Sequence, residues 1–278
     1  LGVLSRVYEI GTQPYLVVSA FAFFPIDRPD VLLGEQSMWK SFAREAAEPI
    51  TGTEEGTAMY AAPAILDEGL PKGRAEVLVR GYAYPLREAG ASEGRGCTAT
   101  LLFGAKDAPL LHKRLAVSGD RRWEFLGMTM PAPFARMPLD WTRAFGGPRF
   151  PANPVGRGQA ATPGPDGKPV HWLPNVEYEG ERMKAKGDRP RPASFAPMDP
   201  TWPTRAEKLG TFDKKWLDTE YPGMPSDLHI ESFNAAPVDQ RLSTWLQDGE
   251  PYVLEHMHPA RPRLEGRLPT FRARAFIR

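Results

Sequence analysis

Hydrophobic positions at the start of the chain follow the pattern of two β-strands. Residues 6–10 carry Val, Tyr and Ile, a break with glycine and proline follows at 11–14, and 15–26 reads YLVVSAFAFFPI. β-Branched and aromatic residues favour strands, and a nearly continuous apolar run predicts a strand buried on both faces. Residues 35–48 instead space Trp, Phe and Ala between charges, which predicts a short amphipathic helix that Pro49 ends.

Further strand-like runs follow after a variable stretch. Residues 76–84 (EVLVRGYAY) alternate imperfectly around Gly81, where we expect a bulge. Runs at 97–103, 111–117 and 121–125 are separated by turns or loops that contain glycine. Runs at this spacing predict an antiparallel meander whose aliphatic and aromatic side chains fill the core.

Proline dominates the middle of the chain. Fifteen of the 30 prolines lie within residues 131–205, which excludes helical and central-strand structure there. A flexible linker is poor in aromatic residues, whereas this stretch carries several large ones. These are Trp141, Phe145, Phe150 and Trp172. We therefore expect an ordered loop region packed on the sheet, with 159–169 and 185–192 as its exposed parts.

The last third mixes short helices and strands. Pro203 suits the first turn of a helix that continues over 204–209. Thr211 is a candidate N-cap for a second helix, FDKKWLDTEY. We expect another short helix at 238–246. Closing strands are predicted at the end of the chain, over 252–257 and 270–277.

These patterns predict a mostly β protein, an antiparallel sandwich or flattened barrel with long ordered proline-rich loops and a few short helices. The chain shows no internal repeat, which argues against propellers and solenoids. We expect a single domain over 1–278, because the proline-rich middle cannot stand alone. It would comprise a β-rich part (1–130), an irregular loop part (131–205) and a mixed C-terminal part (206–278).

Composition narrows the set of partners. The net charge of +1, from 35 basic and 34 acidic residues, creates no overall field that would attract nucleic acid or an anionic membrane. The apolar run at 15–26 is too short to span a bilayer as a helix. Cys97 is the single cysteine, which excludes an internal disulfide and favours a reducing cytoplasm. Six arginines gather in 261–278, where arginines on an edge strand also block edge-to-edge pairing.

Candidate catalytic residues form no recognisable signature, and the chain has no G-x-S-x-G motif. His256 and His258 would share one face of a strand, but a metal would need a third ligand from elsewhere. Glu177 with Asp213, or Asp213 with Asp227, could form the carboxylate pair of a glycosidase, since the fold and not the spacing brings such pairs together. We favour half-buried histidines and hydrogen-bonded loop carboxylates, and expect neither a metal nor a cofactor.

Other polar motifs have structural interpretations. NPVGRG at 153–158 lacks the G-K-[ST] ending of a phosphate-binding loop, so we interpret it as a turn with an exposed Arg157. We predict that several polar and aromatic residues form a lattice that satisfies the amides and carbonyls of the irregular backbone. They are Asn175, Glu177, Arg205, Asp213 and Trp216.

Seven motifs occur in an order and at spacings that resemble one bacterial family. They are EVLVRGYAY at 76–84, VSGDRRW at 117–123, AFGG with NPVGRG at 144–158, LPNVE at 173–177, FAPMDPTWPTR at 195–205, GTFDKKW at 210–216 and FNAAPVDQ at 233–240. Through them the chain is similar to the bacterial domain of unknown function 2169, a family encoded beside type VI secretion effectors and spike components. Residues 1–73 match only as strands followed by a variable stretch.

The resemblance implies a non-catalytic cytoplasmic adaptor or chaperone. It would bind a type VI effector toxin and help to load it on the valine-glycine repeat spike or its proline-alanine-alanine-arginine tip protein. The expected partner-binding edges are the strands at 76–84 and 270–277. The motif positions implied to be structural or partner-binding are Arg157, Asn175, Glu177, Trp202, Arg205, Thr211, Asp213, Trp216, Asn234 and Asp239.

Two alternatives stay open from the residues alone. A hydrolase acting on cell-envelope glycan would use Glu177 or Asp213 as general acid or base, within a deep pocket. A carbohydrate-binding module would use Trp202 and Trp216 as stacking platforms on a flat aromatic strip. A broad apolar groove or an exposed sheet edge would instead favour the adaptor.

Overall fold

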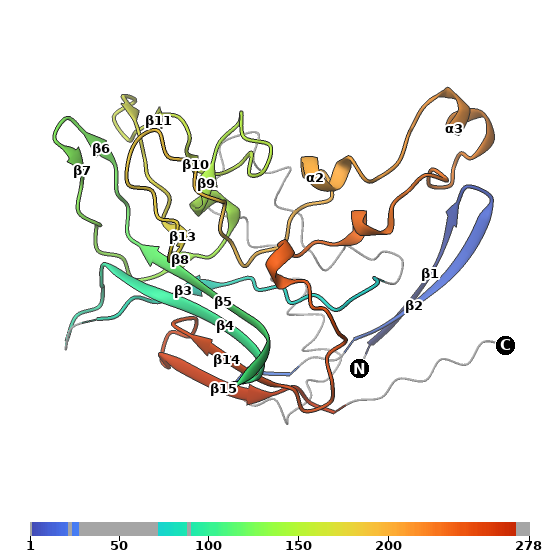
Figure 1. Ribbon diagram of the computed structural model, residues 1–278, viewed down its shortest axis with the longest axis horizontal. Helices are drawn as coiled ribbons and strands as arrows, with labels where there is room; N and C mark the ends of the chain where they lie inside the picture. The colour runs from blue at the N-terminus through green and yellow to red at the C-terminus, as the bar shows by residue number, and fades with distance from the viewer. Residues whose placement is uncertain (1, 22–23, 28–71, 88–89, 271–278) are drawn as a thin grey trace.

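The largest sheet has five strands in the order β13-β5-β4-β14-β15, and every neighbouring pair runs antiparallel (Figure 1). The computed structural model describes residues 2–21, 24–27, 72–87 and 90–270. The strands of this sheet are β4 (Gly96–Ala105), β5 (Ala108–Ser118), β13 (Val176–Tyr178), β14 (Pro251–Glu255) and β15 (Arg263–Arg267). β4 and β5 form the long hairpin expected from the runs at 97–103 and 111–117.

One face of this sheet carries the hydrophobic core. Ala99 and Leu101 of β4 pair in register with Leu115 and Lys113 of β5, so these side chains share one face. All four are buried, and Lys113 is the one charged residue among them. Loop residues cover the face from the proline-rich middle, namely Phe134, Met137, Leu139, Ala193 and Phe195. The prediction of an ordered middle region packed on the sheet is therefore confirmed.

The middle region contains short pieces of regular structure between its prolines. They are β6 (Trp123–Glu124), β7 (Gly127–Met128), β8 (Met137–Pro138), η3 (Trp141–Arg143), β9 (Phe145–Gly146), β10 (Arg157–Gly158), β11 (Thr162–Pro163) and β12 (Pro169–Val170). Two further apolar clusters stabilise it, one around Trp141 and Trp202 and the other around Phe145 and Leu173. Side-chain contacts thus replace the hydrogen-bonded ladders that proline prevents.

The N-terminal runs form a separate antiparallel hairpin of β1 (Gly2–Ile10) and β2 (Gln13–Phe21). Gly2 pairs with Phe21 at the open end, and Ile10 pairs with Gln13 next to the turn. The two strands are as predicted, but burial of 15–26 on both faces is wrong. In the described part of that run, Val17 is the buried side chain, while Tyr15, Leu16 and Val18 are exposed. A two-stranded ribbon has only one face against the body, so its other face remains open.

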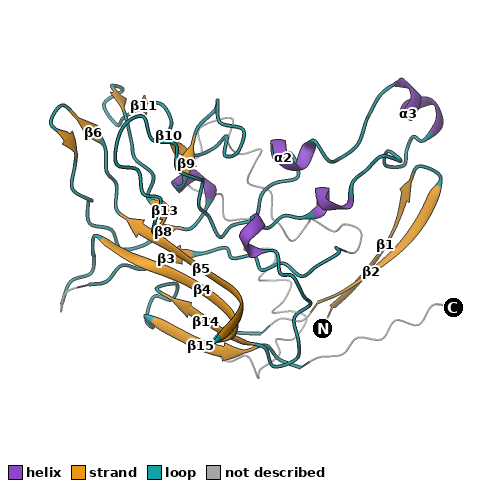
Figure 2. Ribbon diagram, viewed as in Figure 1, coloured by secondary structure: helices purple, strands orange, loops and turns teal. Residues whose placement is uncertain are grey.

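The described helices are short, and all except η3 lie in the last third of the chain (Figure 2). They are α2 (Pro203–Ala206), α3 (Lys214–Thr219), η4 (Ile230–Phe233) and η5 (Val238–Gln240). Pro203 occupies the first turn of α2, as predicted. The N-cap of α3 is Asp213 and not Thr211, because the Asp213 carboxylate accepts a hydrogen bond from Trp216 N at 2.9 Å. The helix expected over 238–246 is reduced to the single turn of η5.

Several predicted strands have different boundaries. The run at 76–84 contributes only β3 (Tyr82–Ala83), which pairs with β8 and not with the main sheet. Within 121–125, β6 pairs with β7, so the meander does not continue past β5. The helix predicted at 35–48 and residues 271–277 of the last predicted strand lie outside the described residues. In the described part, the five-stranded sheet has β13 and β15 at its edges, and the expectation of a mostly β protein with antiparallel sheets is confirmed.

Candidate functional site

The N-terminal hairpin and residues 210–229 together form an arm at one side of the molecule (Figure 1). We call these two segments the arm. Gly11 N donates to Met224 O at 2.8 Å, and Met224 N donates to Glu9 O at 2.7 Å. Gly11 has φ +56°, and a Cβ added there would lie 3.1 Å from Ser226 Cβ. Glycine therefore supplies both the left-handed turn and the space for the second segment.

One face of the hairpin holds the arm to the body. Val17 and Phe233 are buried together, and Tyr8, Ile10 and Leu228 pack against them. These residues come from both strands and from segments near the C-terminal side of α3. The cluster is small, so the arm is attached through few apolar contacts compared with the core of the main sheet.

The opposite face of the hairpin is apolar and exposed. Val7 and Leu16 are direct cross-strand partners, and Val18 follows Leu16 on the same face because side chains alternate along a strand. Their exposed fractions are 66% for Val7, 51% for Leu16 and 41% for Val18. Grouped exposed apolar side chains of this kind mark binding surfaces more often than single ones do.

Trp216 organises the helical part of the arm. Its ring makes edge contacts with Phe212 and Tyr221 at centroid distances of 4.9 and 5.6 Å, and its Nε1 donates to Gly223 O at 2.9 Å. Phe212 and Tyr221 are themselves more than half exposed, as is Leu217. Trp216 thus holds a group of exposed apolar side chains on and next to α3, a short helix with no buried residue of its own.

Thr211 closes the base of this helical segment. Thr211 N donates to Asp227 Oδ1 at 2.9 Å, and its hydroxyl donates to Asp227 Oδ2 at 2.7 Å. The Thr211 backbone N–H and hydroxyl hold the pKa of Asp227 below its ordinary value. Thr211, Asp213 and Trp216 are therefore brought together in the arm. Thr211 joins the two ends of the 211–227 segment through Asp227, whereas Asp213 caps α3.

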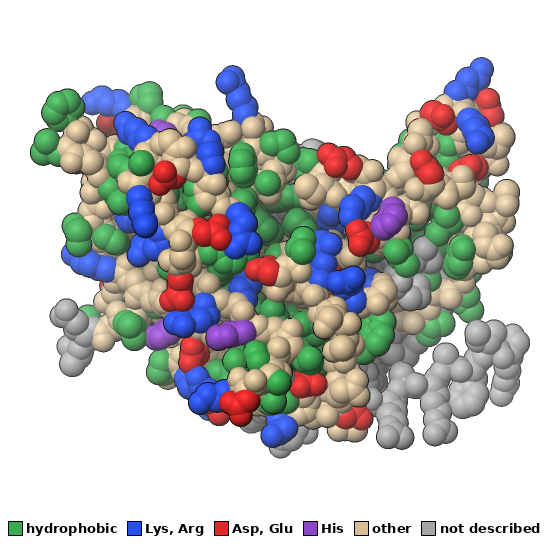
Figure 3. Space-filling model, viewed as in Figure 1, with side chains coloured by type: hydrophobic (Ala, Val, Ile, Leu, Met, Phe, Trp, Pro, Cys, Tyr) green, Lys and Arg blue, Asp and Glu red, His purple; other side chains and the backbone are tan. Residues whose placement is uncertain are grey.

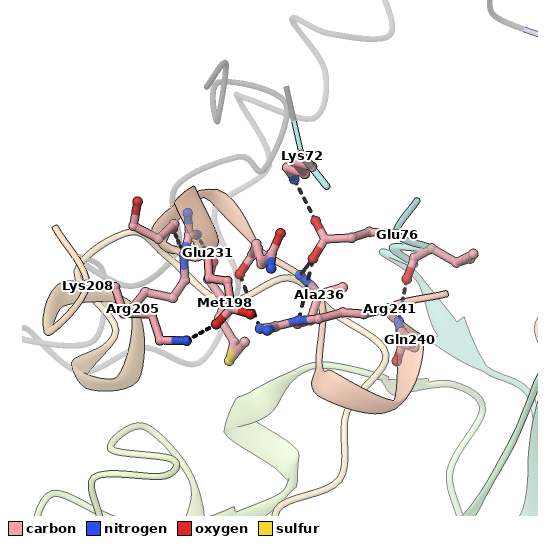
Figure 4. Close-up of polar contacts among 12 residues, drawn as sticks. Lys72, Glu76, Met198, Arg205, Lys208, Glu231, Ala236, Gln240 and Arg241 are labelled. Carbon is pink, nitrogen blue, oxygen red and sulfur yellow. Dashed lines mark hydrogen bonds and ion pairs between the residues drawn. The ribbon is translucent and has the colours of Figure 1, made fainter. Parts of the chain in front are cut away.

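Arg205 lies at the junction between the arm and the body (Figure 4). The buried Arg205 side chain donates to Ser232 O at 2.8 Å and to Met198 O at 2.5 Å. Asn234, two residues after Ser232, is also buried, and its backbone N–H donates to Glu231 O at 3.0 Å. These bonds satisfy carbonyls that no ladder satisfies, which is the lattice role predicted for Arg205.

Glu76 continues this junction toward the main sheet (Figure 4). Its carboxylate accepts from Lys72 Nζ at 2.6 Å and from Ala236 N at 3.2 Å, and it lies 3.6 Å from Arg241 Nε. Arg241 Nε donates in turn to Ala236 O at 3.0 Å. The start of the 76–84 segment is thus held by the FNAAPVDQ motif, far away in sequence.

Asn175 and Arg157 form a second polar cluster with Asp120. Arg157 Nη1 donates to Asp120 Oδ1 and to Asn175 Oδ1, both at 2.8 Å, and Asn175 Nδ2 donates to Asp120 Oδ1 at 3.0 Å. Burial works to raise the pKa of Asp120, but the Asn175 hydrogen bond and the Arg157 charge outweigh it and hold the pKa below its ordinary value. The prediction of an exposed Arg157 is wrong, since its guanidinium is committed to this cluster.

Glu177 belongs to a buried ion pair at the same end of the sheet. Its carboxylate lies 2.5 Å from Arg121 Nη2 and accepts from Met183 N at 2.6 Å. Arg121 also donates to Pro174 O at 2.8 Å. Both side chains are almost fully buried, so each charge relies on the other for compensation.

Asp239 meets Lys113 over the inner face of the sheet. Lys113 Nζ donates to Asp239 Oδ1 at 2.8 Å, to Gln240 Oε1 at 2.8 Å and to Ser194 O at 2.6 Å. Burial lowers the pKa of Lys113 to about 8, and the Asp239 carboxylate works against this shift. Gln240 also donates to Val77 O and Phe195 O at 2.6 and 2.9 Å. Lys113 and Gln240 thus connect β5, the 76–84 segment, the loop at 194–195 and η5.

Sequence reasoning missed Lys113, Arg121, Asp120 and Gln240. A charged residue at a core position of an alternating strand is a usable signal for Lys113, because it interrupts Leu111, Leu115 and Val117. Arg121 and Asp120 have no such signal, since both lie in a loop where charged residues are usual. Their partners come from segments that are distant in sequence and become visible only in the fold.

The residues proposed for other chemistry are not arranged for it. Trp202 is 1% exposed and packs on Trp141, so it offers no stacking platform. Glu177 lies on β13 and Asp213 at the start of α3, on different sides of the molecule (Figure 1). Cys97 packs against the core, and burial raises its pKa to about 12.

The two histidines also differ from the prediction. β14 ends at Glu255, so His256 and His258 lie beyond the strand. His258 Nδ1 accepts from the N–H groups of Ala260 and Arg261 at 3.2 and 3.1 Å. Over the described ranges, no group of three or more His, Cys, Asp or Glu side chains is placed to hold a metal ion.

These elements define a mostly β protein whose irregular loops are fixed on a five-stranded sheet by buried polar contacts, with an apolar arm at one side. The family described as "Uncharacterized protein conserved in bacteria (DUF2169)" matches residues 11–278, and the chain belongs to this family. The membership expected from the seven motifs is confirmed. No curated protein and no solved structure matches the chain significantly. None of the helices described here has the length and apolar character that a membrane span requires.

Proposed function

We propose that this protein is a non-catalytic adaptor that binds a type VI secretion effector in the bacterial cytoplasm and helps to load it on the secretion spike. The outer face of the arm carries the proposal. Val7, Leu16 and Val18 present adjacent apolar side chains on a ribbon whose other face is packed on the body. An effector awaiting export exposes apolar segments, and this face would cover one of them.

The ribbon also offers backbone groups for pairing. In the described part of the chain, β1 and β2 form a sheet of two strands, and Met224 already pairs with the outer edge of β1 at Ile10, so the outer edge of β2 is the one proposed for pairing. An extended segment of the effector would add a strand there and place alternate side chains against the apolar face. We expect an interface of about 1,600 Å² in total, the usual size for a specific complex.

This assignment changes the expected binding edge. The N–H groups of Val77, Val79 and Tyr84 donate to Gln240 O, Phe195 O and His256 O, so the 76–84 segment has little free backbone to offer. β15 is a sheet edge, but Arg263, Glu265 and Arg267 are exposed on it, and charges on an edge oppose strand addition. The arm is therefore the main candidate among the described residues, and residues 271–277 of the other expected edge strand lie outside them.

The contacts of the two carboxylates that a hydrolase would need argue for structural roles. Glu177 compensates the buried Arg121 charge, and Asp213 caps α3. A general acid or base needs a reacting group within hydrogen-bond reach, and these two carboxylates are already used in separate structural contacts. No observation on the described residues favours the hydrolase over the adaptor.

The test measures binding of the effector encoded beside this protein to the double variant Leu16→Ser and Val18→Ser. We expect affinity to fall about tenfold or more, because central apolar residues dominate binding energies. Val238→Ser is the matched control, since Val238 is 76% exposed and lies outside the arm. Equal affinity of the wild type, the double variant and the control would show that the arm is not the binding surface.

A further inference from the structure

The core face of the main sheet carries a cavity of about 490 Å³ that the described side chains leave unfilled. Leu101 of β4 and Leu254 of β14 are register partners and form its floor. Phe103 and Tyr252 line it as well, and their rings pack together with centroids 5.7 Å apart. The 76–84 segment supplies another wall. Small-molecule sites in proteins have volumes of about 300–1,000 Å³, and the cavity lies within this range.

The backbone of the 76–84 segment is fixed in a way that keeps the cavity open. Val77 N donates to Gln240 O at 3.0 Å, and Val77 O accepts from Gln240 Nε2 at 2.6 Å. Val79 N donates to Phe195 O at 3.2 Å. These bonds hold the segment on η5 and on the loop at 195. Protein interiors contain few voids larger than a water molecule, and such voids cost stability. A large apolar void held open by the backbone is therefore typical of a binding site.

The lining of the cavity selects hydrocarbon. Among its described residues, Arg80 carries the one charged side chain, and the others are apolar or aromatic. The hydroxyl of Tyr252 is already used, since it donates to Ile26 O at 2.9 Å. Such a lining favours the burial of an aliphatic chain. It would leave the polar groups of a sugar or a nucleotide without hydrogen-bond partners, which disfavours those ligands.

Arg80 places a positive charge at the opening of the cavity. Val77 and Val79 belong to the main apolar cluster, so this side of the segment faces the core. Leu78 and Arg80 alternate with them and are exposed, which puts the guanidinium at the rim. A guanidinium binds a carboxylate through paired N–H donors, and it has enough donors to do so beside another contact. The apolar interior and the cationic rim are thus complementary to a chain with an anionic head group.

The geometry points to a binding site for a long-chain carboxylate, such as a free fatty acid, with the aliphatic chain against Leu101 and Leu254 and the carboxylate at Arg80. The site lies on the main sheet, apart from the exposed face of the arm, and it does not depend on the adaptor function. Basic and acidic side chains are interspersed over the face seen in Figure 3. That face therefore presents no extended basic patch to an anionic membrane, which favours a free molecule over a bilayer.

Calorimetric titration with dodecanoate, below the concentration at which it forms micelles, tests the site. We expect saturable binding, and about tenfold weaker binding of dodecyltrimethylammonium, which has the same chain and the opposite charge. Arg80→Glu should weaken dodecanoate binding about tenfold as well. Arg189→Glu is the matched control, because Arg189 is exposed and does not line the cavity. Val79→Trp places a large ring in the cavity and should abolish the binding of both probes.

The exposed face of the arm is the competing site for an apolar probe. The double variant Leu16→Ser and Val18→Ser should bind dodecanoate as the wild type does, and loss of binding in it would overturn the inference. A wild type without saturable binding, or with equal affinity for the two probes, would also overturn it. Unchanged dodecanoate binding in Arg80→Glu, which alters an exposed residue and should fold normally, has the same meaning. Each of these results leaves the adaptor proposal as it stands, because effector binding is measured separately.

Discussion

Lys113 is a charged residue buried on the core face of the main sheet. It lies between Leu111 and Leu115 on the core face of β5, where alternation alone predicts a hydrophobic residue. Its ammonium has three donors, and three oxygens from Ser194, Asp239 and Gln240 accept them. Lys113 therefore links the sheet to the loops through three hydrogen bonds, although its buried environment disfavours the charged form.

The Lys113 environment predicts a specific dependence of stability on pH. The pKa of Lys113 is about 8 in the folded protein against 10.5 in the unfolded chain, so the unfolded chain binds more protons between these values. The contribution of Lys113 to the free energy of unfolding should therefore rise with pH, by on the order of 1 kcal/mol between pH 7 and 9. Urea unfolding of the wild type and Lys113→Met over this range checks it. The account would be contradicted if the free energy of unfolding of the wild type, relative to that of Lys113→Met, stayed constant or fell between pH 7 and 9.

The Glu177 ion pair predicts a large effect of a small change. Glu177→Gln removes the charge that compensates the buried Arg121 guanidinium while keeping the shape of the side chain. Breaking one partner of a buried pair costs about 3–5 kcal/mol, so we expect a loss of that order in the free energy of unfolding. Glu179→Gln, on the exposed end of the same segment, is the control and should change stability little. Similar losses in the two variants would show that Glu177 has no special role.

The Asp213 cap predicts a smaller effect. Asp213 is exposed, so Asp213→Ala should cost about 1 kcal/mol through the lost hydrogen bond to Trp216 N. Asp218→Ala changes the same residue type within the same helix without a capping bond and should stay within about 0.5 kcal/mol of the wild type. Chemical denaturation compares the two. An unchanged stability in Asp213→Ala with loss of effector binding would make Asp213 a contact residue instead.

At the scale of elements, the local sequence pattern predicted those strands and helix starts that depend on neighbouring residues alone. β4, β5 and β14 and the first turn of α2 follow from alternation and from Pro203. The 76–84 segment alternates because it crosses the core, yet outside β3 its amides bond to separate loops and form no ladder. β15 was missed because RLEGR is charged, as suits a sheet edge. Thr211 and Asp213 are both residue types that suit an N-cap. In the fold, Thr211 bonds to Asp227 and Asp213 accepts from Trp216 N, and the sequence alone does not distinguish these roles.

The candidate site was predictable only in part for the same reason. Motif positions such as Trp216 and Arg205 could be identified, since they lie in the motifs GTFDKKW and FAPMDPTWPTR that carry the family resemblance. Their roles depend on partners such as Gly223 and Ser232, which the fold supplies. The exposed face of the hairpin could not be predicted, because an apolar run looks the same whether one face or two are covered.

The arm should therefore behave as a local unit. Trp216→Ala removes the ring that contacts Phe212 and Tyr221 and the hydrogen bond to Gly223 O. Hydrogen exchange should accelerate in 210–224 while β4 and β5 keep their protection, since the main core does not include Trp216. Trp245→Ala is the control, because Trp245 is 57% exposed. Faster exchange throughout the sheet would show that the arm and the core unfold together.

At the scale of the whole molecule, the arm lies at one side of a body whose loops are held on the five-stranded sheet by buried polar contacts (Figure 1). The arm presents the exposed apolar face of the hairpin. The sheet and its covering loops carry the main core, whereas the arm is attached to the body through a small apolar cluster.

The most direct test of the adaptor role is to express the effector with and without this protein, and to measure its solubility, its association and its intact mass. The account predicts that the effector is soluble only in a stable complex with this protein, and that its mass is unchanged after release. An effector that is soluble and exported alone, or one whose mass changes when this protein is present, would contradict the account.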